Sequence, residues 1–240
     1  MSNPHLRFHS STVALLAATV VALLLLVHPR AEASLDWQPT RTWVFVVGTL
    51  EWENAEALPP FPKDKRRDLQ LVNFFKKAGV ADDQIIYLQD QEATLATIQD
   101  QLNDFLPKAS EGDLLIVYYC GHGYPSGDDP KRIIMASYDA SPDEEGWSYE
   151  ALVKAIERHF KGDRALIISD CCHAGGAIGA AKRNGKRVSY STLGSSTFSQ
   201  ESTANWTYTE SVLAAFRGSP AVDLDSDGWI TLGETQQFAR

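Results

Sequence analysis

Two apolar runs, each ending in small and reactive residues, constrain this chain of 240 residues most strongly. The run Leu114–Tyr119 is followed by the letters CGHG, and the run Ala165–Ser169 by DCCHAGG. Short apolar runs of this kind predict buried strands of a parallel sheet, in which ligands bind at the carboxyl ends of the strands. We therefore expect His122 and Cys172, which lie 50 positions apart, to meet at that edge and form a Cys–His catalytic site.

Strands and helices alternate along the rest of the chain. The apolar run Thr42–Gly48 predicts a central strand. Apolar residues at helical spacing predict helices over Asp64–Gly79 and over Thr94–Ala109, the second with Thr94 as its N-cap. The other expected strands are Gln84–Leu88, Asp113–Tyr119, Arg132–Ser137, Arg164–Ser169 and Val188–Ser195, and the other expected helices are Ser148–Phe160, Gly175–Ala181 and Tyr208–Phe216. This alternation predicts an α/β fold, with a mostly parallel central sheet and helices on both faces.

The N-terminus predicts export. Val13–Val27 is apolar apart from Thr19, Arg7 precedes it, and Ala31-Glu-Ala33 supplies the small-x-small pattern of a signal-peptidase site. The run is shorter than the ~20 residues of a membrane span. We expect residues 1–33 to be a signal peptide and the protein to be periplasmic or secreted. An uncleaved N-terminal membrane anchor is the alternative.

Charge and cysteine content exclude several classes of protein. The net charge is −9, and removing residues 1–33 takes away two cations and one anion, which gives −10. An acidic chain argues against nucleic acid as a partner. Three cysteines are too few for a disulfide scaffold. We expect a monomer that contacts a membrane only through an uncleaved N-terminal anchor.

The residue types at the two strand ends suit peptide hydrolysis by a thiol. Cys172 supplies a nucleophile, and His122 supplies the proton for the leaving amine. The amides of Gly123 and Cys172 are candidates for an oxyanion hole. If the segment after Cys172 is a helix, its N-terminal dipole would favour the thiolate.

The segments YYCGHG and DCCHAGG resemble the caspase and metacaspase family of cysteine peptidases, and the resemblance runs from about Arg41 to about Gly218. It implies a caspase-like three-layer sandwich and a cysteine endopeptidase whose dyad is His122 and Cys172, at the separation that the family has. The caspase signature QACxG is absent from the sequence, which places the chain nearer to the metacaspases, of the bacterial type.

The resemblance also assigns two further residues. Gly123 matches the oxyanion glycine, and Asp170 matches the metacaspase aspartate that lines the primary specificity pocket. A carboxylate there implies protein or peptide substrates with Lys or Arg before the scissile bond. Ala174 departs from the family's serine, which puts one local hydrogen bond in doubt.

Other readings of these residues stay open. Cys171 could be a packed core residue, and His173 could have a structural role. The cysteines and histidines of both segments could bind zinc, although their spacings match no zinc pattern. A disulfide between Cys120 and Cys171 would suit an oxidising compartment. The whole chain could be an inactive, calcium-binding scaffold on a caspase-like fold.

The segment Lys182–Arg187 is a basic cluster in an acidic chain. It follows the cysteine segment, where caspase-like chains carry the linker between their large and small parts. An enzyme that prefers basic residues could cleave itself there. A solvated loop is the alternative.

The segment 223–234 matches a calcium loop of the EF-hand type, with acidic residues at loop positions 1, 3, 5 and 12 and Gly228 at the turn. The expected Ca²⁺ ligands are Asp223, Asp225, Asp227, Trp229 through its carbonyl, Thr231 and Glu234. A weakly binding acidic turn is the alternative. The expected domains are therefore a signal peptide or anchor (1–33), a caspase-like peptidase domain (34–219) and a calcium-binding segment (220–240).

Overall fold

The computed structural model describes residues 6–9, 35–64, 66–141, 146–202 and 205–240. They form two compact units, one of residues 38–210 and one of residues 211–240 with the described part of residues 1–37. The division falls inside helix α5 (Thr207–Phe216), whereas the sequence suggested a boundary between residues 219 and 220. It falls there because the end of α5 packs within the smaller unit, where Ala215 is buried with Val222 and Ile230.

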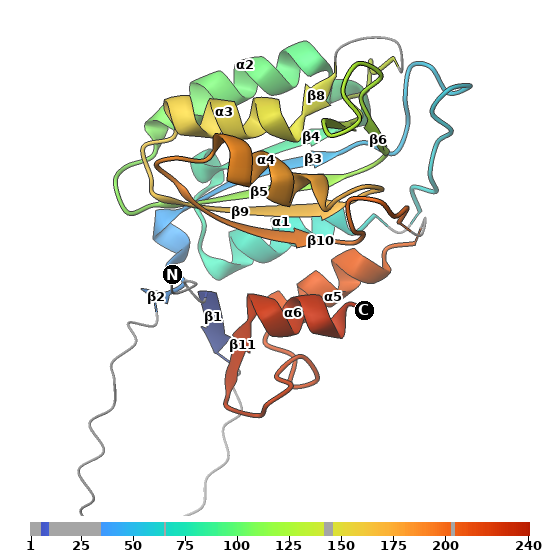
Figure 1. Cartoon of the computed structure of the whole chain (residues 1–240). Helices are drawn as coiled ribbons and strands as arrows, with labels where there is room; N and C mark the ends of the chain where they lie inside the picture. Colours follow the sequence, from blue (N-terminus) through green and yellow to red (C-terminus); the bar gives the residue numbers. More distant parts are fainter. Residues whose placement is uncertain (1–5, 10–34, 65, 142–145, 203–204) are drawn as a thin grey trace, which may run out of the picture. The chain divides into compact units, whose positions relative to one another are not determined.

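A five-stranded, fully parallel sheet forms the centre of the larger unit (Figure 1). Its order is β10-β9-β5-β3-β4, so β5 and β9 are neighbours although helix α3 separates them in the sequence. The strands are β3 (Thr42–Gly48), β4 (Ile85–Gln89), β5 (Leu114–Cys120), β9 (Arg164–Asp170) and β10 (Ser189–Gly194). Every residue of β3 and β5 is buried, as expected for inner strands that are covered on both faces.

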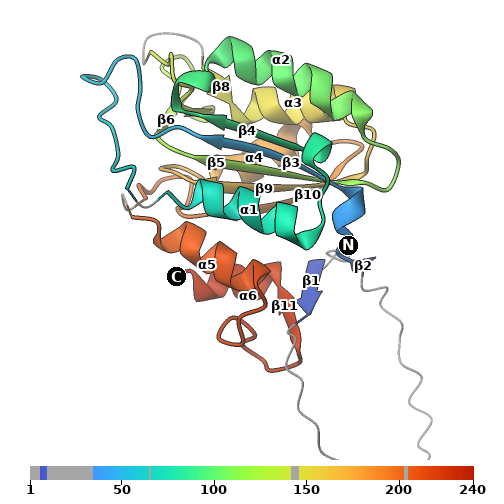
Figure 2. The ribbon, with the colours of Figure 1, turned by 180° about the vertical axis from the view of Figure 1, so that it is seen from behind.

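Helices cover both faces of this sheet (Figures 1 and 2). The helices α2, α3 and α4 lie on one face and α1 on the other. Their bounds are α1 (Asp68–Ala78), α2 (Leu95–Phe105), α3 (Tyr149–His159) and α4 (Gly176–Asn184). The arrangement confirms the predicted caspase-like three-layer fold.

Local capping explains where the helices begin and end. Thr94 accepts a hydrogen bond from the N–H of Thr97 and caps α2, as predicted. Ser148 caps α3 in the same way. Helix α1 ends at Gly79, whose φ of 101° is readily adopted by glycine. It begins at Asp68, later than the predicted Asp64, and the buried side chain of Asp68 accepts a hydrogen bond from the hydroxyl of Tyr87.

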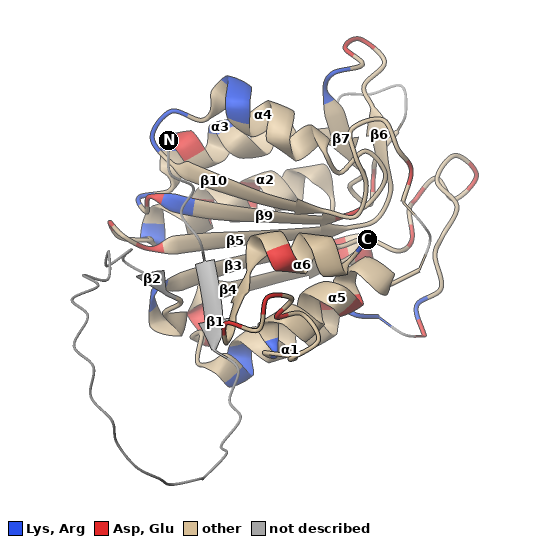
Figure 3. Cartoon of the chain, turned by 60° about the horizontal axis from the view of Figure 1, so that its bottom comes forward, with Lys and Arg blue, Asp and Glu red and all other residues tan. Residues whose placement is uncertain are grey.

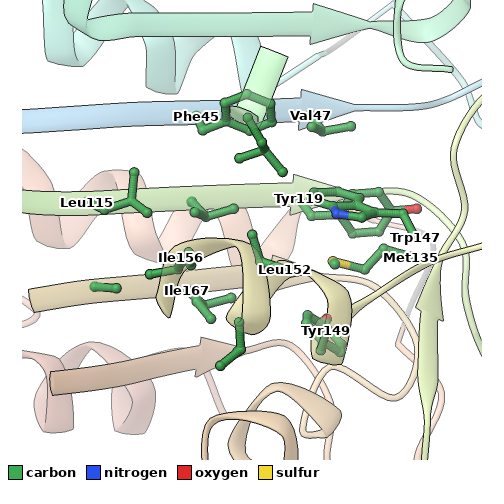
Figure 4. Packing of buried hydrophobic residues seen from close by; sticks show 14 of the residues in the cluster. Phe45, Val47, Leu115, Tyr119, Met135, Trp147, Tyr149, Leu152, Ile156 and Ile167 are labelled. Carbon is green, nitrogen blue, oxygen red and sulfur yellow. The ribbon is translucent and has the colours of Figure 1, made fainter. Parts of the chain in front are cut away.

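The larger core lies between the sheet and the helices α2, α3 and α4 (Figure 4). Alternate residues of a strand point to the same face, so Phe45, Leu115 and Ile167 all face these helices. Leu152 and Ile156 of α3 pack over them and are fully buried. This packing fixes the strand ends that carry the candidate site.

A second, antiparallel sheet consists of β6 (Gly123–Pro125), β7 (Ile133–Met135) and β8 (Trp147–Ser148). Residues 124–131 are polar and contain glycine and proline, which predicts a loop, but Gly123–Pro125 pairs with Ile133–Met135 instead. The backbone that follows His122 is therefore held in a ladder.

The basic cluster Lys182–Arg187 is not the predicted loop. Helix α4 continues through Asn184, so only the last three residues of the cluster lie outside it. Arg183 is paired with Glu150. Arg187 donates to the carbonyl oxygen of Gly162 at 2.8 Å. Side-chain pairing and good helix formers thus carry the helix further than its small residues alone suggested.

The smaller unit combines sheet strands with the C-terminal helix. Strand β1 (Leu6–His9) pairs antiparallel with β11 (Trp229–Thr231) and parallel with β2 (Leu35–Asp36), and helix α6 spans Leu232–Phe238. β1 falls inside the predicted signal peptide, whereas the apolar run Val13–Val27 lies outside the described residues. Among the described helices, none is long and apolar enough to cross a membrane.

Candidate active site and candidate metal centre

The pairing of β5 with β9 brings the two predicted segments together. Cys120 lies opposite Asp170 in the parallel ladder, so His122 and Cys172 each follow a paired strand end by two residues. The N–H of Gly121 donates to the carbonyl oxygen of Asp170 at 3.4 Å. A Cβ added to Gly123 would lie 2.2 Å from the carbonyl oxygen of Cys172. Only glycine at this position lets the segments around residues 123 and 172 approach so closely.

The imidazole of His122 is held by the loop that follows β3. Its Nε2 lies 2.9 Å from the carbonyl oxygen of Pro59. A carbonyl can only accept, so Nε2 carries the proton and Nδ1 is the basic nitrogen. The backbone is also fixed, because the hydroxyl of Tyr119 donates to the carbonyl oxygen of His122 at 2.7 Å.

Two aromatic rings flank the same imidazole. The rings of Trp52 and Phe61 each lie 4.5 Å from the ring of His122, centre to centre. Burial lowers the pKa of His122, and the hydrogen bond to the Pro59 carbonyl offsets only part of that effect. The ring is therefore neutral at neutral pH and can accept a proton.

Cys172 is partly exposed, and its Sγ accepts a hydrogen bond from the N–H of Ser202 at 3.3 Å. The helix expected from Gly175 begins at Gly176, so no helix starts at the thiol. Residues 172–175 form turns, and α4 begins only at Gly176. The helix dipole falls off within the first turn, so it does not act on Cys172 as predicted.

The turn around Cys172 is held by a serine-rich segment. The hydroxyls of Ser195 and Ser196 both donate to the carbonyl oxygen of Cys171, at 3.1 and 3.0 Å. The N–H of Ala174 donates to Ser196 Oγ at 3.0 Å. His173 is structural, as the sequence suggested: its Nδ1 lies 2.8 Å from the carbonyl oxygen of Phe198. These bonds position the turn although Ala174 replaces the family's serine.

Asp170 is a partly buried carboxylate at the end of β9. Its Oδ2 accepts hydrogen bonds from the hydroxyl of Thr209 at 2.5 Å and from the Thr209 N–H at 3.2 Å. The Thr209 hydroxyl in turn lies 2.6 Å from the hydroxyl of Tyr118. Burial raises the pKa of Asp170, and these hydrogen bonds offset only part of the rise. Among the ion pairs of the described residues, none includes Asp170.

A single cavity of about 370 Å³ joins these residues. Its lining includes His122, Cys172 and Asp170, together with Asp64. Its remaining walls are Leu50, Phe61, Pro62, Cys120, Gly121, Cys171, Ser202, Asn205 and Trp206. A thiol, a neutral imidazole and a partly buried carboxylate therefore line the same cavity, together with apolar residues.

The other two cysteines are buried free thiols. Cys171 packs in the core, with the hydroxyl of Tyr149 3.4 Å from its Sγ, and burial raises its pKa to about 12. Burial also raises the pKa of Cys120. Both stay protonated at neutral pH, so the partly exposed Cys172 is the thiol available for chemistry.

The acidic loop forms a candidate metal centre in the smaller unit (acidic residues red in Figure 3). Carboxylate oxygens of Asp223, Asp225 and Asp227 all lie within 4.8 Å of one another. Gly228 has a φ of 86° and its N–H donates to Asp223. Left-handed backbone at this position allows the sharp turn of a calcium loop.

Glu234, the predicted last ligand, lies outside this group of three. Its Oε2 accepts from the N–H and the hydroxyl of Thr231, and its Oε1 from the N–H of Leu224. With Thr231 it forms a capping box at the start of α6. Burial works against ionisation, but these hydrogen bonds lower the pKa of Glu234, so it carries a charge near the loop.

Sequence reasoning missed the residues that hold His122. The prolines of the loop after β3 predict only a connection, yet this loop supplies the Pro59 carbonyl and the rings of Trp52 and Phe61. Aromatic residues in a loop that follows a central strand were the available signal. Thr209, which binds Asp170, gave no signal because it lies in an apolar helix far along the chain.

Fold and site together define a class of α/β protein with a cysteine and a histidine at the carboxyl edge of a parallel sheet. The sequence model of the caspase domain matches residues 62–225, which is about two thirds of the chain. The chain therefore belongs to the caspase domain family of cysteine peptidases.

Two individual proteins are similar to this chain. Metacaspase-7 of Arabidopsis thaliana is 28% identical over 118 residues, which cover 43% of this chain and 28% of that protein. The chain thus spans less than a third of this curated relative. A crystal structure of a Geobacter sulfurreducens protein has a TM-score of 0.58 at 14% identity, and the match covers 80% of this chain and 91% of the other. That likeness supports the fold.

Proposed function

We propose that this protein is an exported cysteine endopeptidase that cleaves after Lys or Arg. One observation carries the proposal: a partly exposed thiol, a neutral imidazole and a partly buried carboxylate without a cationic partner among the described residues line one cavity. Membership of a cysteine peptidase family supports the reaction class. The predicted signal peptide supports export, and an uncleaved anchor is the alternative.

The proposed reaction uses Cys172 and His122 in turn. His122 Nδ1 accepts the thiol proton while Cys172 Sγ attacks the scissile carbonyl carbon. The oxyanion forms near the amides of Gly123 and Cys172, and it collapses as the C–N bond breaks and the imidazolium gives its proton to the leaving amine. Water then attacks the thioester, His122 accepts its proton, and the carboxylic acid leaves as the thiol is restored.

The proposed specificity follows from the surroundings of Asp170. Its charge lies in a cavity with apolar walls, where a carboxylate is costly unless a cation pairs with it. A Lys or Arg side chain of the substrate would supply that cation. The protein's own hydrogen bonds to Asp170 come from Thr209 and from the side chain of Ser195, which are neutral groups. Asp64 adds a second negative charge to the cavity lining.

Peptide hydrolysis tests the proposed activity. We expect the purified full chain to cleave fluorogenic peptides with Arg or Lys before the scissile bond, and not a matched peptide with Asp there. Cys172→Ala should abolish turnover, because no other described thiol is accessible. The measurement is kcat/KM under reducing conditions, with and without calcium. No turnover by the unaltered protein in either condition would favour the inactive calcium-binding scaffold instead.

Replacing the specificity carboxylate should change substrate choice more than chemistry. For Asp170→Asn we expect kcat/KM for an Arg peptide to fall by roughly 100-fold, because losing one partner of a buried ion pair costs about 2–5 kcal/mol. A peptide with citrulline, the neutral isostere of Arg, should lose far less. Since the pKa of Asp170 is raised, the Arg preference should also weaken as pH falls through that raised pKa. An unchanged Arg-to-citrulline ratio would contradict the proposed role.

We further propose self-processing at the basic cluster, confined to its non-helical end. Lys186 is exposed and lies beyond the end of α4, whereas Lys182 lies inside the helix. A peptidase needs an extended substrate, so the helical site is protected.

Mass spectrometry of the purified protein tests this site. We expect the unaltered chain to be cut after Lys186, and Cys172→Ala to stay intact. Lys186→Gln should block the cut, whereas the matched variant Lys182→Gln should not. A single intact mass for the unaltered chain, shared with Cys172→Ala, would contradict self-processing.

We propose that the acidic loop binds one Ca²⁺. Three convergent carboxylates and the left-handed Gly228 support this ligand, because Ca²⁺ prefers oxygen ligands from a loop of this pattern. The carbonyl of Trp229, the Thr231 position and Glu234 would complete the set. Ligation by Glu234 would exchange its hydrogen bond from the Leu224 N–H for the cation.

Direct binding measurements test the calcium site. We expect titration calorimetry to show one Ca²⁺ per chain, and Tb³⁺ luminescence excited through Trp229 to be displaced by Ca²⁺. Asp223→Asn should abolish both signals because it removes one of the three convergent charges. The exposed Asp83→Asn, which changes the net charge equally, should leave both intact. Equal binding by the two variants would indicate non-specific attraction to an acidic chain.

A further inference from the structure

The loop that holds His122 is itself tied to the sheet by a buried cluster of charges. Residues 49–67 connect β3 to α1 and include Pro59, whose carbonyl accepts from His122. Both ends of this loop reach one carboxylate, that of Asp90, which follows β4 and is only 6% exposed. Asp90 adopts a φ of 50°, a left-handed backbone that turns its side chain toward the loop.

Each oxygen of Asp90 binds a different end of the loop. At the start of the loop, the N–H of Leu50 donates to Oδ1 at 2.8 Å. At its end, Arg66 Nη1 lies 2.6 Å and Lys63 Nζ 3.3 Å from Oδ2. The N–H of Phe61 also donates to the carbonyl oxygen of Leu50 at 2.8 Å, so Pro59 lies in a closed loop.

Other charged groups complete the cluster. Glu51 pairs with Lys63 at 2.5 Å, and Asp68 pairs with Arg66 at 2.6 Å. Asp68 also accepts from the hydroxyl of Tyr87 at 2.9 Å. Arg66 reaches the carbonyl oxygen of Gly48 at the end of β3 as well. Two cations thus face three carboxylates, and the cluster is anchored to the end of β3, to Tyr87 within β4 and to Asp90 after it.

We infer that Asp90 is a positioning residue for the proposed dyad: by binding both ends of the loop, it holds the Pro59 carbonyl and the rings of Trp52 and Phe61 against His122. Asp90 is not among the residues that line the active-site cavity, so it acts through His122 and not on the substrate. The inference rests on the proposed function, because it assigns the loop a role in orienting a catalytic base.

The inference predicts a particular pH signature. Loosening the loop would remove both influences on His122, namely burial, which lowers its pKa, and the Pro59 hydrogen bond, which raises it. Burial is the larger influence, so the pKa of His122 should rise when the loop is freed. A base must be neutral to accept a proton, so the acid limb of the pH profile should move to higher pH.

Asp90→Asn is the informative variant, and Asp113→Asn is its matched control. Asparagine tolerates the left-handed backbone and keeps an acceptor for Leu50, but loses the charge that binds Arg66 and Lys63. Asp113 is equally buried at 7% and binds Arg41 and the Trp43 indole, but it precedes β5, at the opposite end of the sheet from His122.

For Asp90→Asn we expect kcat/KM to fall by roughly tenfold to 100-fold, because small misplacements of catalytic groups cost up to about 100-fold. Its acid limb should move to higher pH. Asp113→Asn should lower the melting temperature comparably and leave the acid limb in place. Lys63→Met removes a half-exposed cation from the same cluster and should shift the limb less, in the same direction. It keeps the test decisive if Asp90→Asn fails to fold.

Alkylation of Cys172 by iodoacetamide, followed by peptide mass across pH, separates this inference from the peptidase proposal. His122→Ala defines the contribution of the imidazole to that profile. If peptides are not cleaved but the His122 contribution moves in Asp90→Asn and not in Asp113→Asn, the inference stands without the peptidase. Identical acid limbs in Asp90→Asn, Lys63→Met and the unaltered protein would overturn the inference. So would coincident profiles for His122→Ala and the unaltered protein, since there would then be no pair to position.

Discussion

The parallel pairing of β5 with β9 is the constraint on which the candidate site depends. The ladder sets Cys120 opposite Asp170. Because of this register, the residues that follow β5 and β9 leave the sheet next to each other. A shift of one residue would turn the Asp170 carboxylate to the other face of the sheet. Packing of buried strand residues such as Val117 and Ile167, which face the same helices, fixes the register. Core packing thereby positions His122 and Cys172, which lie outside the core.

The buried and partly buried carboxylates of this protein differ in whether a cation of the protein pairs with them. Asp90 and Asp68 are paired with Arg66, and Asp113 binds Arg41 and the Trp43 indole. Each of these charges is compensated inside the protein. Asp170 is bonded by hydroxyl and amide groups of Thr209 and has no cationic partner among the described residues. Desolvation raises the pKa of Asp170, and its hydrogen bonds from neutral groups offset only part of that rise. A cation brought by a substrate would remove it.

The sequence predicted the sheet and the pairing of the two motifs because both depend on local pattern. Apolar runs mark β5 and β9, and in a parallel sheet the loops after both strands leave at the same edge. It did not predict the groups that act on the motifs from a distance. The Pro59 carbonyl is a backbone group and has no signature in the sequence, and Thr209 lies 39 positions after Asp170. The end of α4 was misjudged because the pairing of Arg183 with Glu150, 33 residues earlier, is a tertiary contact.

Different segments of the chain hold His122 and Cys172 in place. Cys172 lies in a turn held by hydrogen bonds from Ser195 and Ser196, so its place depends on β10 and the segment that follows it. His122 depends on the loop after β3, on the far side of β5. The two groups are thus supported by opposite halves of the sheet, with β5 and β9 between them. A rigid sheet is then needed to keep a thiol and a base in reach of each other, because no local segment contains both.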